Sequence, residues 1–544
     1  MTDVLSRIAD HRPSGINDIS SWRYAVSVAE LTGCALHQSS FTECLLINRC
    51  YAETTIMSRS PATTFEYLQF HAASTPDRVA LIMDDGEYTY GRFADDALRF
   101  TKALADLGIE RRQIVSIHHP HFYIEWLLTI ACENLGAVSV SDDARNWKRA
   151  NYLYQHVDVG LTNTPADEEP SFQYHCLTDD WVRATLRMDL AIAQKQPVIV
   201  PELDDLVRIT RSSGSTDAPK LIPLTRNVQN HRQGDDIRFG LIHTDSIVLI
   251  IGVGFIINGN LLLCSACCQV GATVIRSRLP AKAIHDHKVN FTMGLPLALN
   301  QLLNDYRKGS LSKSNMIIEV GGAALSGSLR DELYSVISER LFNRLGTNEA
   351  TTILLMKDHE IGFVTPGTKL EIHDEQHRPV PDGTPGLISV RTPGMIEGYY
   401  KNEEETRKRF HTGWFYTGDA GIMVGPRKVK LLGRADDMVI MGGVNESPLV
   451  LEDTLRNGAG VKDAAVVGIK ASDGGDLVCV ALVLTDDANV EAIRAGIHKL
   501  WAVYRVRIII AVVDDLARTE NGKVSRAKVR DFFRDQLEAE VAAS

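Results

Sequence analysis

The segment TRSSGSTDAPK, from Thr210 to Lys220, decides how the rest of the sequence is interpreted. Gly214 makes its backbone flexible, and its Ser and Thr residues can turn hydroxyl and N–H groups inward around phosphate oxygens, while Lys220 adds a positive charge. It is not a Walker loop, which needs glycine immediately before the lysine, because Pro219 stands there and has no N–H to donate. Taken alone, the segment predicts either a phosphate-binding loop or a plain Ser/Gly surface loop.

Five further segments of the chain resemble motifs of a single protein superfamily. They are GGAALS (Gly321 to Ser326), LGTNE (Leu345 to Glu349), GMIEGYY with GWFYTGD (Gly413 to Asp419), GRADDMVIMGGVNESPLVLE (Gly433 to Glu452) and RTENGKVSR (Arg518 to Arg526). Together with the segment from Thr210 to Lys220, they resemble the motifs of the adenylate-forming superfamily in the same order. That superfamily contains acyl- and aryl-CoA ligases, nonribosomal peptide synthetase adenylation domains and beetle luciferases, and this chain looks most like an acyl-CoA ligase.

The resemblance implies a fold and a division into domains. The fold is α/β, with a large N-terminal body of stacked sheets and helices followed by a small, mobile α+β domain. The implied parts are an N-terminal extension without an assigned role (residues 1–60), the large adenylate-forming domain (residues 61–435) and the small C-terminal domain (residues 436–544).

The hydrophobic pattern predicts the same fold class without the resemblance. Apolar residues at helical spacing predict a helix that ends near Gly108; they are Phe93, Ala97, Phe100, Leu104 and Leu107. The runs that follow alternate between strand and helix, which predicts parallel βαβ units: 114–118, 123–135 and 137–140. The stretch from Arg378 to Gly386 predicts turns. The last hundred residues predict a small α+β domain, with helices at 447–455 and 489–504, strands at 464–469, 477–484 and 506–513, and a charged final helix.

Composition excludes several classes of protein. The 544 residues include 58 Lys and Arg against 69 Asp and Glu, a formal net charge of −11, so a broad electrostatic surface for nucleic acid is not expected. The longest apolar run, Ile247 to Ile257, is shorter than the ~20 residues of a membrane span and predicts a buried strand. No signal peptide is evident, so we expect a cytoplasmic protein. The nine cysteines are irregularly spaced, which favours reduced thiols.

Catalytic roles follow from the resemblance. Lys523 would neutralise the charge that builds on the α-phosphate of ATP when a carboxylate attacks it. Glu349, together with Thr216, would hold Mg²⁺, which prefers oxygen ligands. Asp436 takes the hinge position, about which the small domain would rotate before a thiol attacks the acyl-adenylate.

The resemblance also implies the binding residues. Nucleotide binding is expected from Ser212, Ser213, Gly214, Ser215, Thr216, Lys220, Gly322, Ala323, Ala324, Gly346, Thr347, Asn348, Asp419 and Arg434, the last two at the ribose. The acyl pocket is expected at Phe255, Asn258, Gly259, Gly294, Gly321 and Gly346. The turn at Gly442 and Gly443 would line the channel for the pantetheine arm of CoA.

The substrate prediction rests on what the loop after the apolar run lacks. Amino-acid-activating relatives carry an Asp in that loop, whereas GFIINGN (Gly254 to Asn260) has no acid, so an amino-acid substrate is disfavoured. The aromatic His common there in acyl-CoA ligases is replaced by Phe255 or Ile256, depending on the alignment. Glycines around an apolar pocket predict a bulky or extended hydrophobic acid. The alternative is that these glycines serve backbone turns.

Departures from the family pattern leave other functions open. Asp217 replaces a Gly, Leu345 a Tyr, Asn348 a Thr and Ile440 a common Lys. A carboxylate about 5 Å from a phosphate charge costs on the order of 3 kcal/mol at an effective dielectric near 20. The chain could therefore be a ligase that only converts a preformed acyl-adenylate, supplied by a separate adenylating enzyme, to the CoA thioester. It could also load an acyl group onto a phosphopantetheinyl carrier protein, or bind a nucleotide or acyl ligand without catalysis.

Overall fold

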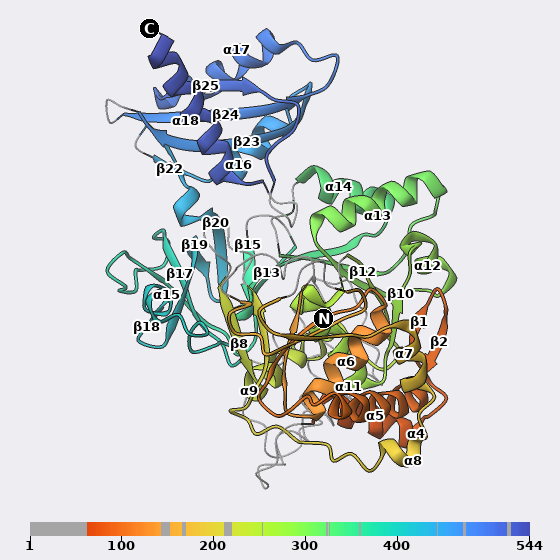
Figure 1. Ribbon diagram of the computed structural model, residues 1–544. Coiled ribbons are helices and arrows are strands. Elements are labelled where there is room, and N and C mark those ends of the chain that lie inside the picture. Colours follow the sequence, from red (N-terminus) through yellow and green to blue (C-terminus); the bar gives the residue numbers. More distant parts are fainter. Residues whose placement is uncertain are drawn as a thin grey trace, which may run out of the picture. The chain divides into compact units, whose positions relative to one another are not determined.

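The computed structural model describes residues 62–142, 153–165, 170–211, 220–252, 254–322, 325, 327–357, 361–442, 444–471, 475–518 and 524–543 (Figure 1). The predicted N-terminal extension, residues 1–60, lies outside these residues. None of the helices in the described ranges is long and apolar enough to cross a membrane.

The largest sheet has 14 strands and combines parallel and antiparallel pairing. Along the sheet its strands are β16 (Lys369–His373), β17 (Gly386–Arg391), β19 (Trp414–Gly425), β20 (Lys428–Arg434), β15 (Ile361–Val364), β14 (Thr351–Met356), β13 (Arg340–Thr347), β12 (Ile317–Gly321), β11 (Phe291–Gly294), β9 (Ile247–Ile250), β10 (Thr273–Arg276), β1 (Val79–Met83) and β2 (Gly86–Thr89), with β18 (Phe410–His411) paired to β19. The strands from β13 to β1 are parallel, so the carboxyl ends of β11, β12 and β13 meet at one edge. Sites form at such edges.

A second sheet of six strands contains the predicted βαβ unit. Its order is β6 (Gln173–Cys176), β5 (Val159–Thr162), β3 (Ile114–His118), β4 (Val138–Ser141), β7 (Leu206–Arg211) and β8 (Leu221–Thr225). Strands β3 and β4 are parallel and are joined by α6 (Phe122–Asn134), as predicted. The predicted helix before them is α5 (Tyr90–Asp106), and Gly108 follows it with a φ of 84°, in the left-handed region that ends helices.

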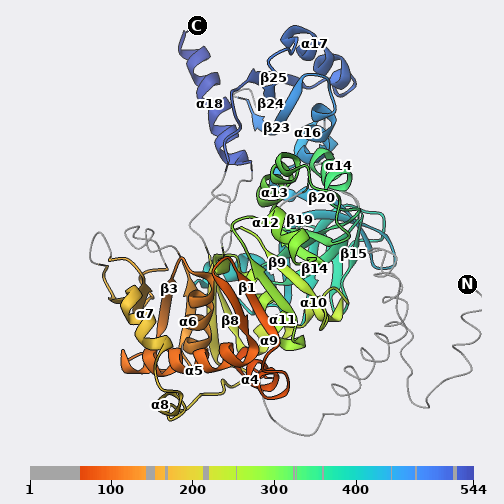
Figure 2. The same ribbon diagram turned by 90° about the vertical axis from the view of Figure 1, so that its right-hand side faces the viewer.

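Helices enclose the two sheets with a shared apolar core. The α5 helix packs against α6 and α4 (Thr64–Ser74) (Figure 2). Side chains of α11 (Asn258–Val270) belong to the same apolar core. The remaining helices of this part of the chain are α7 (Asp179–Leu186), α8 (Leu190–Ala193), α9 (Arg226–Gln233), α10 (Asp235–Arg238), α12 (Pro280–Asp286), α13 (Pro296–Gly309), α14 (Gly327–Val336) and α15 (Glu403–Arg409). The α/β fold class is thus confirmed.

The apolar run from residue 247 to 257 is only partly the strand that was predicted. β9 ends at Ile250, and a short 3₁₀ helix, η2 (Gly254–Ile256), follows. Gly252 and Gly254 have φ values of 80° and 63°, a conformation that glycine adopts without steric cost, so the chain turns there instead of extending.

The C-terminal segment forms its own small sheet, as the pattern predicted. Strands β23 (Val461–Lys470), β24 (Asp476–Leu484) and β25 (Arg507–Val512) are accompanied by η3 (Ala435–Asp437), β21 (Val439–Met441), β22 (Val444–Glu446), α16 (Pro448–Arg456), α17 (Val490–Trp501), η4 (Ala502–Tyr504) and α18 (Arg526–Ala543). Alternate residues of β23 enter different apolar clusters, with Val466 in one and Val467 in the other. The sheet is therefore covered on both faces. The boundary at residue 436 stays a prediction.

Candidate active site

Glu349 lies just beyond the end of β13 and is 9% exposed. The hydroxyl of Thr347 accepts the N–H of Ala350 at 3.0 Å and shapes the turn that carries Glu349. One carboxylate oxygen, Oε1, accepts a hydrogen bond from the Tyr399 hydroxyl at 2.9 Å. The described residues donate no hydrogen bond to the other oxygen, so a nearly buried carboxylate keeps an oxygen available. That fits a single protein ligand for Mg²⁺, which takes few carboxylates and completes its shell with phosphates and water.

Arg232 on α9 fixes the backbone beneath Glu349. Its guanidinium donates to the carbonyl oxygens of Asn348 at 2.9 Å, Glu349 at 3.1 Å and Gly394 at 2.8 Å. Burial lowers its pKa to about 10, so it stays charged at neutral pH. Sequence reasoning missed Arg232 because it lies in a polar stretch, RNVQNHRQ, that reads as a solvent-facing helix.

Asn348 has a definite structural role although it departs from the family pattern. Its side-chain amide donates to the carbonyl oxygen of Arg211 at 2.8 Å. Arg211 ends β7 and is the second residue of the segment from Thr210 to Lys220, so Asn348 joins the start of that segment to Glu349. The predicted loop residues Ser212, Ser213, Gly214, Ser215 and Thr216, and Asp217 with them, lie outside the described residues.

Lys220 has a carboxylate partner. Its Nζ lies 2.6 Å from the Glu405 carboxylate on α15 and 5.3 Å from the centre of the Tyr399 ring. Hydrogen bonds from Lys220 and then Lys408 lower the pKa of Glu405 to about 2, so Glu405 is negative at neutral pH. Glu405 therefore partly neutralises the positive charge of Lys220. The sequence did not predict this ion pair. Tyr399 connects Lys220 to Glu349.

The structure brings Asp419 and Arg434 together, on neighbouring strands. They are paired residues of β19 and β20, with 3.6 Å between Oδ1 of Asp419 and Nη1 of Arg434. Arg434 also donates to the carbonyl oxygen of Thr417 at 2.8 Å. Asp419 is buried, whereas Asp436 is largely exposed on η3, 3.8 Å from Arg434. Their roles at the ribose and at the hinge stay predictions.

The predicted pocket glycines divide into two groups. A Cβ on Gly346 would lie 2.7 Å from the carbonyl oxygen of Thr351, and one on Gly294 would lie 2.6 Å from Ile251. A Cβ on Gly259 would meet the flexible end of the Met293 side chain at 3.0 Å. These three glycines therefore have close neighbours, and their role in the acyl pocket stays a prediction. Gly321 differs because a Cβ there would meet no described atom within 4 Å. Its neighbour Gly322 has a φ of 73°, while Ala323 and Ala324 lie outside the described residues.

The η2 segment turns Phe255 inward and Ile256 outward. The Phe255 ring is fully buried, 4.7 Å from the Phe122 ring centre. Arg208, itself buried, donates to the Phe255 carbonyl oxygen at 2.9 Å and to the Asn258 side chain at 3.1 Å. Ile256 is 39% exposed. Of the two candidates for the position of the family His, Ile256 thus presents its side chain at the surface, and Phe255 and Asn258 contribute to the core.

Gly442 is required by the packing of the small sheet. Its φ is 59°, and a Cβ there would lie 2.0 Å from the carbonyl oxygen of Tyr504 on η4. Close approach of two backbone segments therefore explains this glycine. Gly443 lies outside the described residues, and the CoA-channel role of both residues stays a prediction.

We expect Gly442→Ala to destabilise the small sheet by about 2 kcal/mol or more, because it adds a backbone clash to a left-handed conformation. Gly496→Ala is the matched control: a Cβ there meets no described atom within 4 Å, and alanine in helix α17 is expected to add roughly 0.5–1 kcal/mol of stability. Hydrogen exchange of β23 and β24 in the full chain measures both changes. Equal protection in the two variants would contradict the packing role of Gly442.

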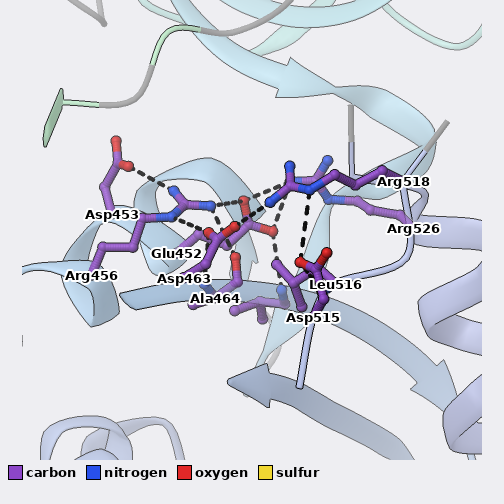
Figure 3. A network of polar contacts seen from close by, with 10 residues as sticks. Glu452, Asp453, Arg456, Asp463, Ala464, Asp515, Leu516, Arg518 and Arg526 are labelled. Atoms are coloured by element: carbon purple, nitrogen blue, oxygen red, sulfur yellow. Dashed lines mark hydrogen bonds and ion pairs between the residues drawn. The ribbon is translucent and has the colours of Figure 1, made fainter. Parts of the chain in front are cut away.

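Ion pairs fix both ends of the segment that contains Lys523 (Figure 3). Arg518 pairs with Asp463 at 2.6 Å, and Arg526 donates to both oxygens of the buried Glu452 at 2.7 and 2.8 Å. An isolated antiparallel bridge also joins Arg518 to Val524. The described residues on the two sides of the segment are therefore directly paired. Lys523 itself lies outside the described residues.

Comparisons with known proteins identify the family of the chain. Residues 68–400, more than half of the chain, match the family described as AMP-binding enzyme. The chain is 24% identical over 527 residues to 4-coumarate–CoA ligase-like 9 of Oryza sativa subsp. japonica, covering 87% of this chain and 93% of the relative. It is 23% identical to a long-chain-fatty-acid–CoA ligase of Escherichia coli, covering 67% and 68%.

The fold is also similar to that of a solved structure, ATP-bound MatB from Rhodopseudomonas palustris. The TM-score is 0.75 at 22% identity, covering 87% of this chain and 99% of that chain. The chain belongs to the AMP-binding enzyme family, the adenylate-forming superfamily whose motifs its sequence carries, and is an acid–thiol ligase of the AMP-forming type.

Proposed function

We propose that this protein activates a hydrophobic, non-amino carboxylic acid as its acyl-adenylate and transfers the acyl group to the thiol of CoA. The observation that carries the proposal is the buried Glu349 carboxylate, which accepts a hydrogen bond from Tyr399. Arg232 binds the backbone carbonyl oxygen of Glu349, and Lys220 lies 5.3 Å from the centre of the same Tyr399 ring. A buried acid with an available oxygen, next to a phosphate-loop lysine, suits a nucleotide with its metal.

The two steps balance without an additional reactant. A carboxylate oxygen of the acid attacks the α-phosphorus of ATP, the bond to the β-phosphate oxygen breaks, and pyrophosphate leaves. The CoA sulfur, having lost its proton, then attacks the acyl carbon, and AMP leaves. Mg²⁺, when bound, supplies charge neutralisation at the phosphates. Glu349 holds it, Lys523 neutralises the equatorial oxygens, and Asp419 with Arg434 orients the ribose.

Two features support a hydrophobic acid. The segment from Gly254 to Asn260 contains no carboxylate that could pair with an α-amino group, and Ile256 exposes an apolar side chain there. Gly321, at the carboxyl end of β12, leaves open space among the described residues. The relatives named as ligases of 4-coumarate and long-chain fatty acids point to the same class of substrate.

We expect Gly321→Val to narrow the acyl site. The added branched side chain should lower kcat/KM for a bulky acid by about tenfold or more, because a pocket discriminates strongly by size. A short acid should react at the unchanged rate and serves as the internal control. Product assays with an acid series measure the ratio, and an equal loss for long and short acids would contradict a role of Gly321 in the pocket.

Two assays separate the complete reaction from its second half. Exchange of labelled pyrophosphate into ATP reports adenylation, and consumption of CoA from a preformed acyl-adenylate reports thioester formation. We expect both activities. Thioester formation without pyrophosphate exchange would show that the protein depends on a separate adenylating enzyme. The Lys220–Glu405 ion pair and Asp217 are the two features that favour this alternative. Transfer of the acyl group to a phosphopantetheinyl carrier protein, without transfer to CoA, would show that the carrier protein is the acyl acceptor.

A further inference from the structure

Arg409 differs from the other basic residues at the end of α15. Arg407 lies 3.5 Å from Glu403, and Lys408 lies 2.8 Å from Glu404, so both pair with acids of their own helix. Arg409 forms no ion pair and donates no hydrogen bond within the described part of the chain. It is nevertheless only partly exposed. A shielded guanidinium without a carboxylate is unusual, because burial of an unpaired charge is costly.

The position of Arg409 is defined by Gly418. A Cβ on Gly418 would lie 2.5 Å from Nη1 of Arg409 and 2.6 Å from Nη2 of Arg434, so both guanidinium groups approach the same backbone position. The φ of Gly418 is 80°, which also favours glycine. Among the described residues, Arg434 pairs with Asp419 at 3.6 Å and with the exposed Asp436 at 3.8 Å.

Arg409 also lies near the Glu349 side of the site. Its positive charge acts on Tyr399, the residue whose hydroxyl binds Glu349. Arg409 is therefore close to Gly418, the neighbour of the candidate ribose residue Asp419, and its charge reaches Tyr399, which binds the candidate metal ligand Glu349. In a nucleotide the phosphates lie between the metal and the ribose.

We propose that Arg409 and Arg434 together bind a phosphate group of the substrate, Arg409 being an additional phosphate-binding residue outside the motifs that the sequence shares with its superfamily. This inference rests on the proposed function. The position of Arg409 near the candidate metal and ribose residues favours a phosphate of the nucleotide. CoA also carries phosphates, so the experiment compares the binding of AMP with that of CoA.

The experiment measures binding of adenosine, AMP, CoA and pantetheine to the full chain by calorimetry. Arg409→Gln removes the charge, Arg409→Lys keeps it, and Arg407→Gln, on the same helix but exposed, is the matched control. We expect Arg409→Gln to weaken the binding of AMP about tenfold and to leave the binding of adenosine unchanged, because glutamine cannot form the charge-assisted hydrogen bond to a phosphate. Arg409→Lys should recover part of the loss, and Arg407→Gln should bind like the unaltered protein.

The binding results distinguish a nucleotide phosphate site from a CoA phosphate site and from no phosphate site at Arg409. Loss of CoA binding with unchanged pantetheine and AMP would keep the phosphate site and assign it to CoA. Equal losses for adenosine and AMP, or no loss for AMP and CoA, would overturn the role of Arg409. Failure of the unaltered protein to bind any nucleotide would instead contradict the proposed function and, with it, this inference.

Discussion

Lys523→Ala is expected to lower the rate of acyl-adenylate formation by about two to three orders of magnitude, the usual cost of removing one transition-state cation or donor. Among the described residues on either side of Lys523, Arg518 pairs with Asp463 and Arg526 with Glu452. The resemblance assigns Lys523 to the first half-reaction. Consumption of CoA from a preformed acyl-adenylate should therefore fall far less than pyrophosphate exchange.

Lys528→Ala is the matched control for Lys523→Ala. Lys528 is exposed on α18, and its removal changes the net charge equally. Exchange within a few-fold of the unaltered protein is expected. If Lys523→Ala behaved like Lys528→Ala, the catalytic assignment of Lys523 would be wrong.

Glu349→Gln is expected to reduce ATP-dependent turnover by about a hundredfold and to raise the Mg²⁺ concentration needed for half-maximal activity. Glutamine keeps the size of the side chain and an oxygen for the Tyr399 hydroxyl, so the change removes mainly the negative charge that a divalent cation requires. Initial rates of pyrophosphate exchange across a Mg²⁺ series measure both effects.

Tyr399→Phe is the matched variant that separates loss of the Glu349 charge from loss of its hydrogen bond. It removes one hydrogen bond to the carboxylate and retains the charge, so a loss of about tenfold or less is expected. Glu349→Gln with an unchanged Mg²⁺ requirement would show that Glu349 does not hold the metal, even if activity fell.

Local patterns predicted most of the fold. The helix ending near Gly108, the strands at 114–118 and 137–140 and the elements of the small sheet follow from apolar spacing and turn residues, and all of them are present. The apolar run beginning at Ile247 was predicted less well, because a hydrophobic stretch identifies burial but not conformation. Gly252 and Gly254 end the strand through their left-handed backbone.

Contacts between distant segments explain what sequence reasoning missed in the site. Arg232 binds the carbonyl oxygen of Gly394, 162 residues away, and Lys220 pairs with Glu405. Neither partner can be identified from spacing along the chain. The surroundings of a glycine cannot be predicted from the sequence for the same reason. A Cβ on Gly346 would meet the carbonyl oxygen of Thr351, whereas one on Gly321 would meet no described atom within 4 Å.

If one chain performs both adenylation and thioester formation, mass spectrometry should detect the products of both steps in one reaction with ATP, Mg²⁺, CoA and a library of hydrophobic acids. We expect AMP, pyrophosphate and the CoA thioester of one or more acids, in equal amounts and only when all reactants are present. If no hydrophobic acid yields AMP or a thioester, while an amino acid or acetate does, the proposed function is wrong.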